Sequence, residues 1–163
     1  MKKIGLVIEK MIEYYKDDPH QVNHFLKVYG FAKTISEMEN SEENTKEIIE
    51  IAAVMHDIGI KNSLKKYNSS SGNYQEIEGP PEARKILEDM EYDLGLIYRV
   101  CWLIAHHHTY DKIEGMDYQI LVEADFLVNV YENDLSKEQK RNIYNNIFKT
   151  STGKKIFKDI YDM

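Results

Sequence analysis

Cysteine is nearly absent from this sequence, because Cys101 is the only one among 163 residues. A single thiol excludes both an intrachain disulfide framework and a cysteine-based zinc cluster. Long apolar runs are also missing, since none approaches the roughly 20 residues that a bilayer-spanning helix needs. The short apolar stretch near the N-terminus is interrupted by Glu9 and Glu13, and no small-residue cleavage site follows it, unlike in a signal peptide. These absences indicate a reduced, cytoplasmic protein without a membrane span.

Basic residues are also scarce, with 21 Lys and Arg against 28 Asp and Glu and a net charge of −7. Nucleic acids and anionic membrane surfaces both attract a basic face, so we expect neither to be a partner. Hydrophobic residues make up 42% of the chain and charged residues 30%, as in ordinary globular proteins. The length predicts one domain over residues 1–163. The sequence leaves open whether the chain forms a homo-oligomer.

Only three prolines occur, and the stretches between them follow helical rather than alternating periodicity. The pattern predicts an all-α fold, a bundle of six to eight helices. Residues 61–79 are polar, rich in Ser, Gly and Asn and without period, so we expect a long surface loop there. Pro81 is then expected to start the next helix. The expected helices cover residues 2–16, 19–38, about 41–59, 81–91, 95–107, 118–132, 136–149 and 153–162.

Histidine and aspartate occur inside the most apolar of these helices. His56 and Asp57 end a strongly apolar segment, and Asp125 lies in the apolar segment ILVEADFLVNVY. Polar groups in such surroundings are costly unless they are paired. A divalent metal would neutralise the carboxylates and would use neutral imidazoles as ligands.

Each residue taken singly has another interpretation. A lone buried histidine is more often a hydrogen-bonded core residue than a ligand. Asp125 could cap a helix or pair with Arg99, and His20, one turn before His24, could be a surface residue. Only the joint pattern favours a metal site.

Three segments of that pattern resemble the HD superfamily of metal-dependent phosphohydrolases. HFLKVYGFAKTI (24–35) resembles the opening helix of the family, AAVMHDIGI (52–60) its HD signature, and EADFLVN (123–129) its closing aspartate. The order is a histidine, then HD 32 residues later, then an aspartate. The resemblance implies a single HD domain with a core over about 20–131, followed by C-terminal helices over 136–162.

The resemblance also implies a metal site made of His24, His56, Asp57 and Asp125. Two imidazoles and two carboxylates suit Fe, Mn, Ni, Co or Zn and leave positions for water and substrate. Without a thiolate ligand, such a site is not a structural zinc cage.

Some HD families hold two metals, and there an aspartate in the position of Asp57 bridges them. One of the two further histidines of those families is replaced here by Glu78. Glutamate can ligate a metal, act as a general base or simply face solvent. The other slot falls in CWLIAHHHTY (101–110), where helical spacing favours His107 as the ligand. His106 or His108 would then line the pocket and contact phosphate or the other metal.

The implied activity is hydrolysis of a small phosphorylated molecule, with a nucleotide as the expected substrate. Lys61 is the favoured phosphate contact, although the family's lysine often lies one position earlier. Lys65 and Lys66, in the expected loop, could close over a substrate. We predict Asp57, Lys61, Glu78 and His106 as catalytic residues. Two other readings stay open: a di-iron HD-type oxygenase and a non-catalytic, nucleotide-binding sensor.

Overall fold

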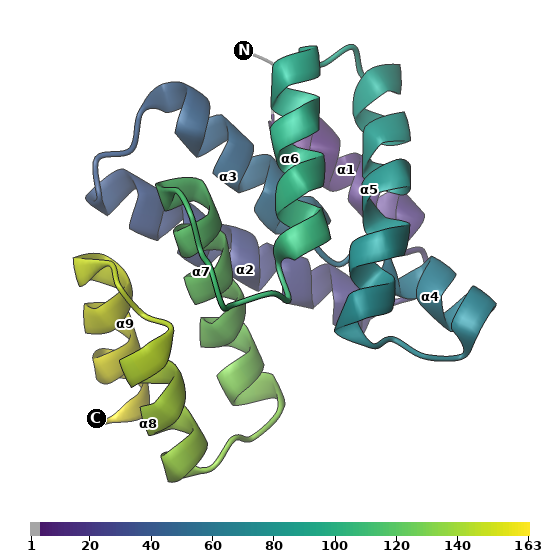
Figure 1. The fold of residues 1–163 in the computed structure, drawn as a ribbon. Helices are drawn as coiled ribbons and strands as arrows, with labels where there is room; N and C mark the ends of the chain where they lie inside the picture. The colour runs from purple at the N-terminus through teal and green to yellow at the C-terminus, as the bar shows by residue number, and fades with distance from the viewer. Residues whose placement is uncertain (1–3) are drawn as a thin grey trace.

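The computed structural model describes residues 4–163, and every regular element in that range is an α-helix (Figure 1). The all-α prediction is therefore confirmed. The described residues form nine helices: α1 (Ile4–Tyr14), α2 (Pro19–Met38), α3 (Glu43–Met55), α4 (Ile60–Tyr67), α5 (Gly72–Asp89), α6 (Leu94–His106), α7 (Met116–Glu132), α8 (Lys137–Asn146) and α9 (Ser151–Tyr161). In this part of the chain no helix combines the length and the apolar character that a membrane span requires.

The start of α2 shows how local chemistry sets a helix boundary. Asp18 is the N-cap, and its carboxylate accepts a hydrogen bond from the Gln21 backbone N–H at 3.1 Å. Pro19 takes the first helical position, where its missing N–H costs nothing. The predicted start of this helix is therefore correct.

The expected loop over residues 61–79 is instead helical, and this prediction was wrong. The segment forms α4 and the first turns of α5, with only residues 68–71 between them. Pro80 and Pro81 lie inside α5 rather than at its start. The buried face of this segment is polar or small, with Ser63, Gln75 and Gly79 among its buried residues. Apolar periodicity therefore gave no sign of these helices.

Close backbone packing holds this region in place. A Cβ on Gly59 would lie 2.5 Å from the backbone oxygen of Gln75 and 2.7 Å from the backbone nitrogen of Gly79. A Cβ on Gly79 would lie 2.6 Å from Ile104 of α6. Only residues without a side chain allow this approach. It places the first turns of α5 next to the HD turn and next to α6.

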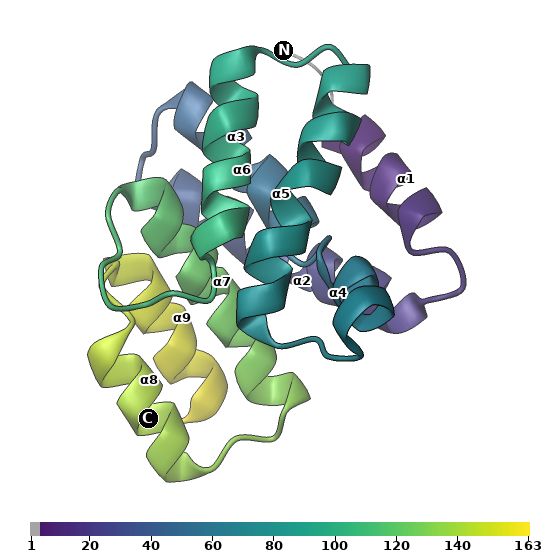
Figure 2. The ribbon, with the colours of Figure 1, turned by 45° about the vertical axis from the view of Figure 1, so that its right-hand side comes forward.

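Helix α2 packs against both α3 and α7, and α3 also packs against α6 and α1. Helices α5 and α6 lie side by side (Figure 2). The C-terminal helices α8 and α9 lie beside α7, away from α5 and α6 (Figure 1). The core is formed by the apolar faces of the central helices, with Phe25, Ile49, Met55, Ile97 and Leu121 among its fully buried side chains. This arrangement brings together the second turn of α2, the end of α3, the end of α6 and the middle of α7.

Candidate metal centre

Four polar side chains meet where α2, α3 and α7 pack together. The Nε2 atom of His24 lies 3.2 Å from Nε2 of His56. It also lies 3.1 Å from Oδ2 of Asp57 and 3.3 Å from Oδ1 of Asp125. His56 Nε2 lies 3.3 Å from each of the same two carboxylate oxygens. These are the four residues predicted to share one metal, and the fold brings them together.

The spacing of these atoms fits the coordination shell of a single ion. With metal–ligand bonds of about 2.0–2.2 Å, neighbouring donors lie roughly 2.9–3.5 Å apart. The four side chains are also well shielded, with exposed fractions of 5% for His24, 0% for His56, 12% for Asp57 and 7% for Asp125. The donor set and its geometry therefore fit a divalent metal.

The opposite nitrogen of each ring shows which tautomer is present. His56 Nδ1 lies 2.8 Å from the backbone oxygen of Ala53, and His107 Nδ1 lies 2.7 Å from that of Ile104. A carbonyl oxygen can only accept, so Nδ1 must carry the proton in both rings. For His24, the acceptor is a carboxylate: Nδ1 lies 3.0 Å from Oε2 of Glu132. When these rings are neutral, each Nε2 therefore has a lone pair that can bind a metal.

Two imidazole Nε2 atoms and two carboxylates therefore converge on one point, where positive charge from ring protons or from a metal ion must offset the carboxylates. Burial lowers the pKa of His24, but the adjacent carboxylates of Asp125 and Asp57 outweigh it and raise that pKa to about 10. Burial would raise the pKa of Asp57, yet the charge of His56 holds it well below its ordinary value. The cluster thus demands positive charge, which a metal supplies without protonating the rings.

A second group of donors adjoins the first through Asp57. His107 Nε2 lies 3.4 Å from Oδ1 of Asp57, whereas Oδ2 faces His24 and His56. His107 is 1% exposed, and its Nε2 has no hydrogen-bond partner among residues 4–163. Asp57, His107 and His108 each offer a ligand atom within 4.8 Å of the others. The two oxygens of Asp57 therefore face two different donor groups, as a bridging carboxylate would.

His108 is held by the first turn of α5, which sequence reasoning placed in a loop. Its Nε2 donates to the side-chain oxygen of Gln75 at 3.0 Å, and its backbone N–H donates to Glu76 at the same distance. Burial and the neighbouring His107 lower the pKa of His108 to about 4. His108 is therefore a neutral ring with Nδ1 free of a proton. No sequence signal pointed to Gln75 or Glu76.

Glu78, predicted as a ligand and as a catalytic residue, has other partners. One oxygen accepts from Lys66 Nζ and the other from the Tyr67 hydroxyl, both at 2.9 Å. Neither donor group within residues 4–163 includes Glu78. Because α4 is a helix rather than a loop, Lys66 is directed to this carboxylate and is not free to close over a substrate.

Lys61 and His106, the other predicted catalytic residues, also lie outside both donor groups. Lys61 Nζ donates to the backbone oxygen of Tyr14 at 3.3 Å and lies 4.9 Å from the centre of the Tyr14 ring. His106 Nδ1 donates to the backbone oxygen of Trp102 at 2.6 Å, and the two rings stack at 3.9 Å. His106 therefore packs against Trp102, whereas His107, the next residue, faces Asp57.

Two other questions raised by the sequence are answered by contacts. Arg99 pairs with Asp117 at 2.7 Å, so it is not the partner of Asp125. Tyr15, the residue after α1, supports the turn that carries His56 and Asp57, because its hydroxyl donates to the backbone oxygen of Asp57 at 2.7 Å. The sequence pattern suggested no role for Tyr15.

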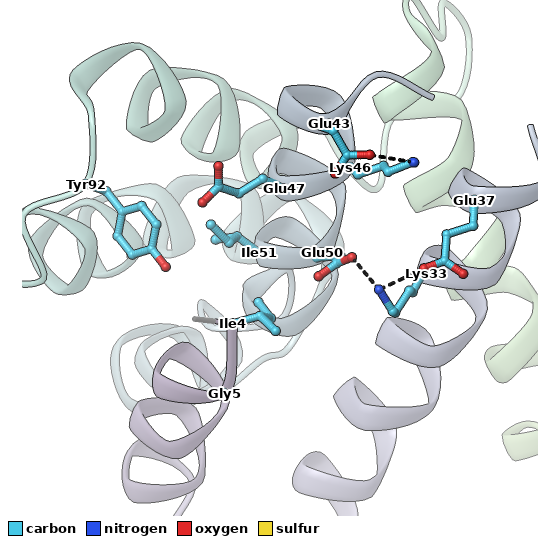
Figure 3. Close-up of a pocket in the computed structure, with 10 residues that line it drawn as sticks. All are labelled: Ile4, Gly5, Lys33, Glu37, Glu43, Lys46, Glu47, Glu50, Ile51 and Tyr92. Carbon is cyan, nitrogen blue, oxygen red and sulfur yellow. Dashed lines mark hydrogen bonds and ion pairs between the residues drawn. The ribbon is translucent and has the colours of Figure 1, made fainter. Parts of the chain in front are cut away.

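A cavity of about 420 Å³ lies elsewhere, between α1, α2, α3 and Tyr92 (Figure 3). Both lysines in its lining pair with glutamates. Lys33 lies 2.9 Å from Glu37 and 3.0 Å from Glu50, and Lys46 lies 2.9 Å from Glu43. None of its lining residues belongs to the donor groups, so the cavity is separate from the metal centre.

Comparison with known proteins agrees with this geometry. The model of the family described as HD domain matches residues 22–149, which include every residue of both donor groups. Among solved structures, the chain is similar to a predicted HD superfamily hydrolase from an uncultured Thermotogales bacterium. The two are 23% identical, the match covers 97% of this chain and 84% of that chain, and the TM-score is 0.71. The likeness concerns the fold. No curated protein matches the sequence.

Proposed function

The chain belongs to the HD domain family, and we propose that it is a metal-dependent phosphohydrolase that acts on a small phosphorylated molecule, with a nucleotide as the expected substrate. Family membership supports hydrolysis that depends on a divalent metal. The observation that carries the proposal is the convergence of His24, His56, Asp57 and Asp125 on one point, where Asp125 Oδ1 is buried and has no hydrogen-bond partner in the described part of the chain. Such a cluster needs positive charge, which a metal ion can supply without protonating the rings.

We assign the residues to two adjacent ions of Fe, Mn, Ni, Co or Zn. Imidazole and carboxylate donors suit these metals better than Mg or Ca, which prefer oxygen alone. The first ion would be held by His24, His56, Asp57 and Asp125. The second would be held by Asp57, His107 and His108. When bound, such ions polarise phosphoryl oxygens and lower the pKa of water.

The protein residues then have distinct tasks. Asp57 belongs to both donor groups, with Oδ2 facing His24 and Oδ1 facing His107, and would thereby fix the distance between the two ions. The carbonyls of Ala53 and Ile104 keep the rings of His56 and His107 in one orientation. Tyr110 is 36% exposed, and its hydroxyl lies 3.4 Å from Nδ1 of His108. Burial and the nearby Asp125 raise its pKa, so the neutral phenol can donate a hydrogen bond to a phosphate oxygen.

The acidic composition also supports a metal in this role. A protein of net charge −7 repels a phosphorylated substrate unless the local field is reversed. Lys61 and Lys66 are paired elsewhere, with Tyr14 and Glu78. Divalent ions supply the positive charge that these side chains do not bring to the donor groups.

The test is turnover after removal and return of metal. The protein is stripped with a chelator, reloaded with Mn²⁺, Co²⁺ or Ni²⁺, and assayed anaerobically against nucleotides and sugar phosphates. We expect phosphate release from at least one substrate with the reloaded protein and none with the stripped one. A di-iron oxygenase would instead require iron and dioxygen, and a sensor would bind a nucleotide without turnover.

The matched pair of variants is Asp57→Asn and Asp117→Asn. Both side chains are 12% exposed, but Asp117 pairs with Arg99. We expect Asp57→Asn to be inactive and Asp117→Asn to keep its metal and its activity. Equal activity in the two variants would contradict the assignment of the site.

A further inference from the structure

His24 differs from the other two imidazoles that face Asp57 in what holds its second nitrogen. Nδ1 of His56 and Nδ1 of His107 donate to backbone carbonyls. Nδ1 of His24 donates to a carboxylate oxygen, Oε2 of Glu132, at 3.0 Å. A full negative charge behind one ring, and neutral oxygens behind the others, makes the three ligands chemically unequal.

We propose that Glu132 is a positioning residue for the metal centre, which orients the His24 ring and strengthens Nε2 as a metal ligand. The inference rests on the proposed function, because it requires that His24 bind a metal. A carboxylate that accepts from the distal N–H of a ligating histidine fixes its tautomer and raises its basicity. A metal drawn to Nε2 makes Nδ1–H more acidic, and a carboxylate stabilises that change better than a carbonyl.

Glu132 is itself held in place. Its other oxygen, Oε1, lies 2.7 Å from Nζ of Lys27, which is on α2 one turn after His24. The Glu132 side chain is 13% exposed. His20 lies farther off, with Nε2 at 3.9 Å from Oε2 and 74% of its side chain exposed. The two oxygens therefore serve separate partners, and the carboxylate cannot rotate away from His24 without losing Lys27.

The location of Glu132 argues against a role in helix stability. It is the last residue of α7, where the negative end of the helix dipole disfavours an acidic side chain. It also follows Asp125 by seven residues, which places both on one face of the helix. One face of α7 thus supplies both a proposed ligand and the group that orients a ligand on α2.

Metal affinity tests the proposal without recourse to turnover. Glu132→Gln keeps an oxygen that can accept from Nδ1 but removes the charge. Glu50→Gln is the matched control, because Glu50 is 14% exposed and pairs with a lysine, Lys33, at 3.0 Å. Each protein is titrated with Co²⁺ against a competing chelator, and the visible Co²⁺ spectrum reports the coordination of the ion. Melting of the metal-free proteins reports stability separately.

We expect Glu132→Gln to weaken Co²⁺ binding by roughly tenfold or more and to alter the spectrum. Glu50→Gln should leave both unchanged, even if it melts earlier. Glu132→Asp keeps the charge but withdraws the carboxylate by one methylene, so its affinity should fall between those of Glu132→Gln and the wild type. If Glu132→Gln does not fold, Glu132→Asp decides alone, with weakened binding expected.

Wild-type affinity in both Glu132 variants would overturn the proposal, as would an equal loss in Glu50→Gln. Failure of the wild-type protein itself to bind Co²⁺ would instead contradict the proposed function. The two failures are therefore distinguishable.

Discussion

Helices α2 and α3 meet at two places that both contain charged residues, and the two differ in how those charges are satisfied. At the cavity of Figure 3, Lys33 of α2 lies between Glu37 and Glu50, so cation and anions alternate. At the candidate metal centre, Nε2 of His24 lies 3.2 Å from Nε2 of His56 and 3.1 Å from Oδ2 of Asp57. Each lysine of the cavity pairs with a glutamate, whereas the donor groups consist of imidazoles and carboxylates without a lysine or arginine. A surplus of converging acceptors marks a metal site better than the volume of an opening does.

The largest expected effect comes from removing a ligand of the first donor group. His56→Ala should reduce bound metal to background and turnover by roughly a hundred- to a thousandfold or more, because the other donors then lose their common ion. The measurements are elemental analysis and the phosphate-release assay. His106→Ala is the control, since His106 stacks on Trp102 outside both donor groups. Stoichiometric metal in His56→Ala would contradict the assignment of the first donor group as the metal site.

A smaller effect is expected from the second donor group. His107→Ala should leave one tightly held metal per chain, since the first group does not depend on His107. Turnover should fall roughly tenfold or more, because one of the two ions that neutralise the phosphoryl oxygens is lost. A metal titration followed by elemental analysis checks this. Two metals leaving together in both His107→Ala and the wild type would indicate a mononuclear centre.

Metal removal should lower stability by a moderate amount. At a metal concentration one hundred times Kd, binding to the native state contributes roughly 2.7 kcal/mol to the free energy of unfolding. For a chain of this length that corresponds to a Tm shift of about 5–10 °C. Thermal melts with and without chelator measure it. His56→Ala should show no response to the chelator, and a full response there would place the stabilising metal elsewhere.

The smallest effect is expected at the cavity. Lys33→Met breaks the pairs with Glu37 and Glu50 and should cost about 1 kcal/mol or less, because these groups are partly exposed to water. Metal content and turnover should stay at wild-type values. Denaturant unfolding and the metal titration measure the two quantities. Loss of metal in this variant would show that the two places are coupled.

The fold was largely predictable where apolar periodicity was strong, as in α2, α3 and α7. It was not predictable over residues 61–79, because the buried face of α4 and early α5 is polar or small. Helix formation there depends on Gly59 and Gly79, which let backbones approach to distances that no Cβ allows. No local pattern reports such a contact, since its partners belong to different helices.

For the candidate site, spacing and resemblance named His24, His56, Asp57 and Asp125, which the structure places together. Helical phase alone favoured His107 over His106 and His108 as a ligand. Its buried Nε2, which has no hydrogen-bond partner among the described residues, is consistent with that prediction. Whether any of these residues binds metal remains a prediction. Glu78 lies instead with Lys66 and Tyr67, and the helical start of α5 gives His108 its partners.

The sequence by itself determined the helical class, because apolar residues recur with helical periodicity. It also indicated which residues need positive charge nearby, because those polar residues lie in strongly apolar segments. Only the tertiary structure decided which charges were already satisfied. Glu132 and His24 are 108 residues apart, and Gln75 and His108 are 33 apart. Such pairs leave no periodic trace, because a hydrogen bond depends on where two helices cross and on which side-chain atoms then lie within reach.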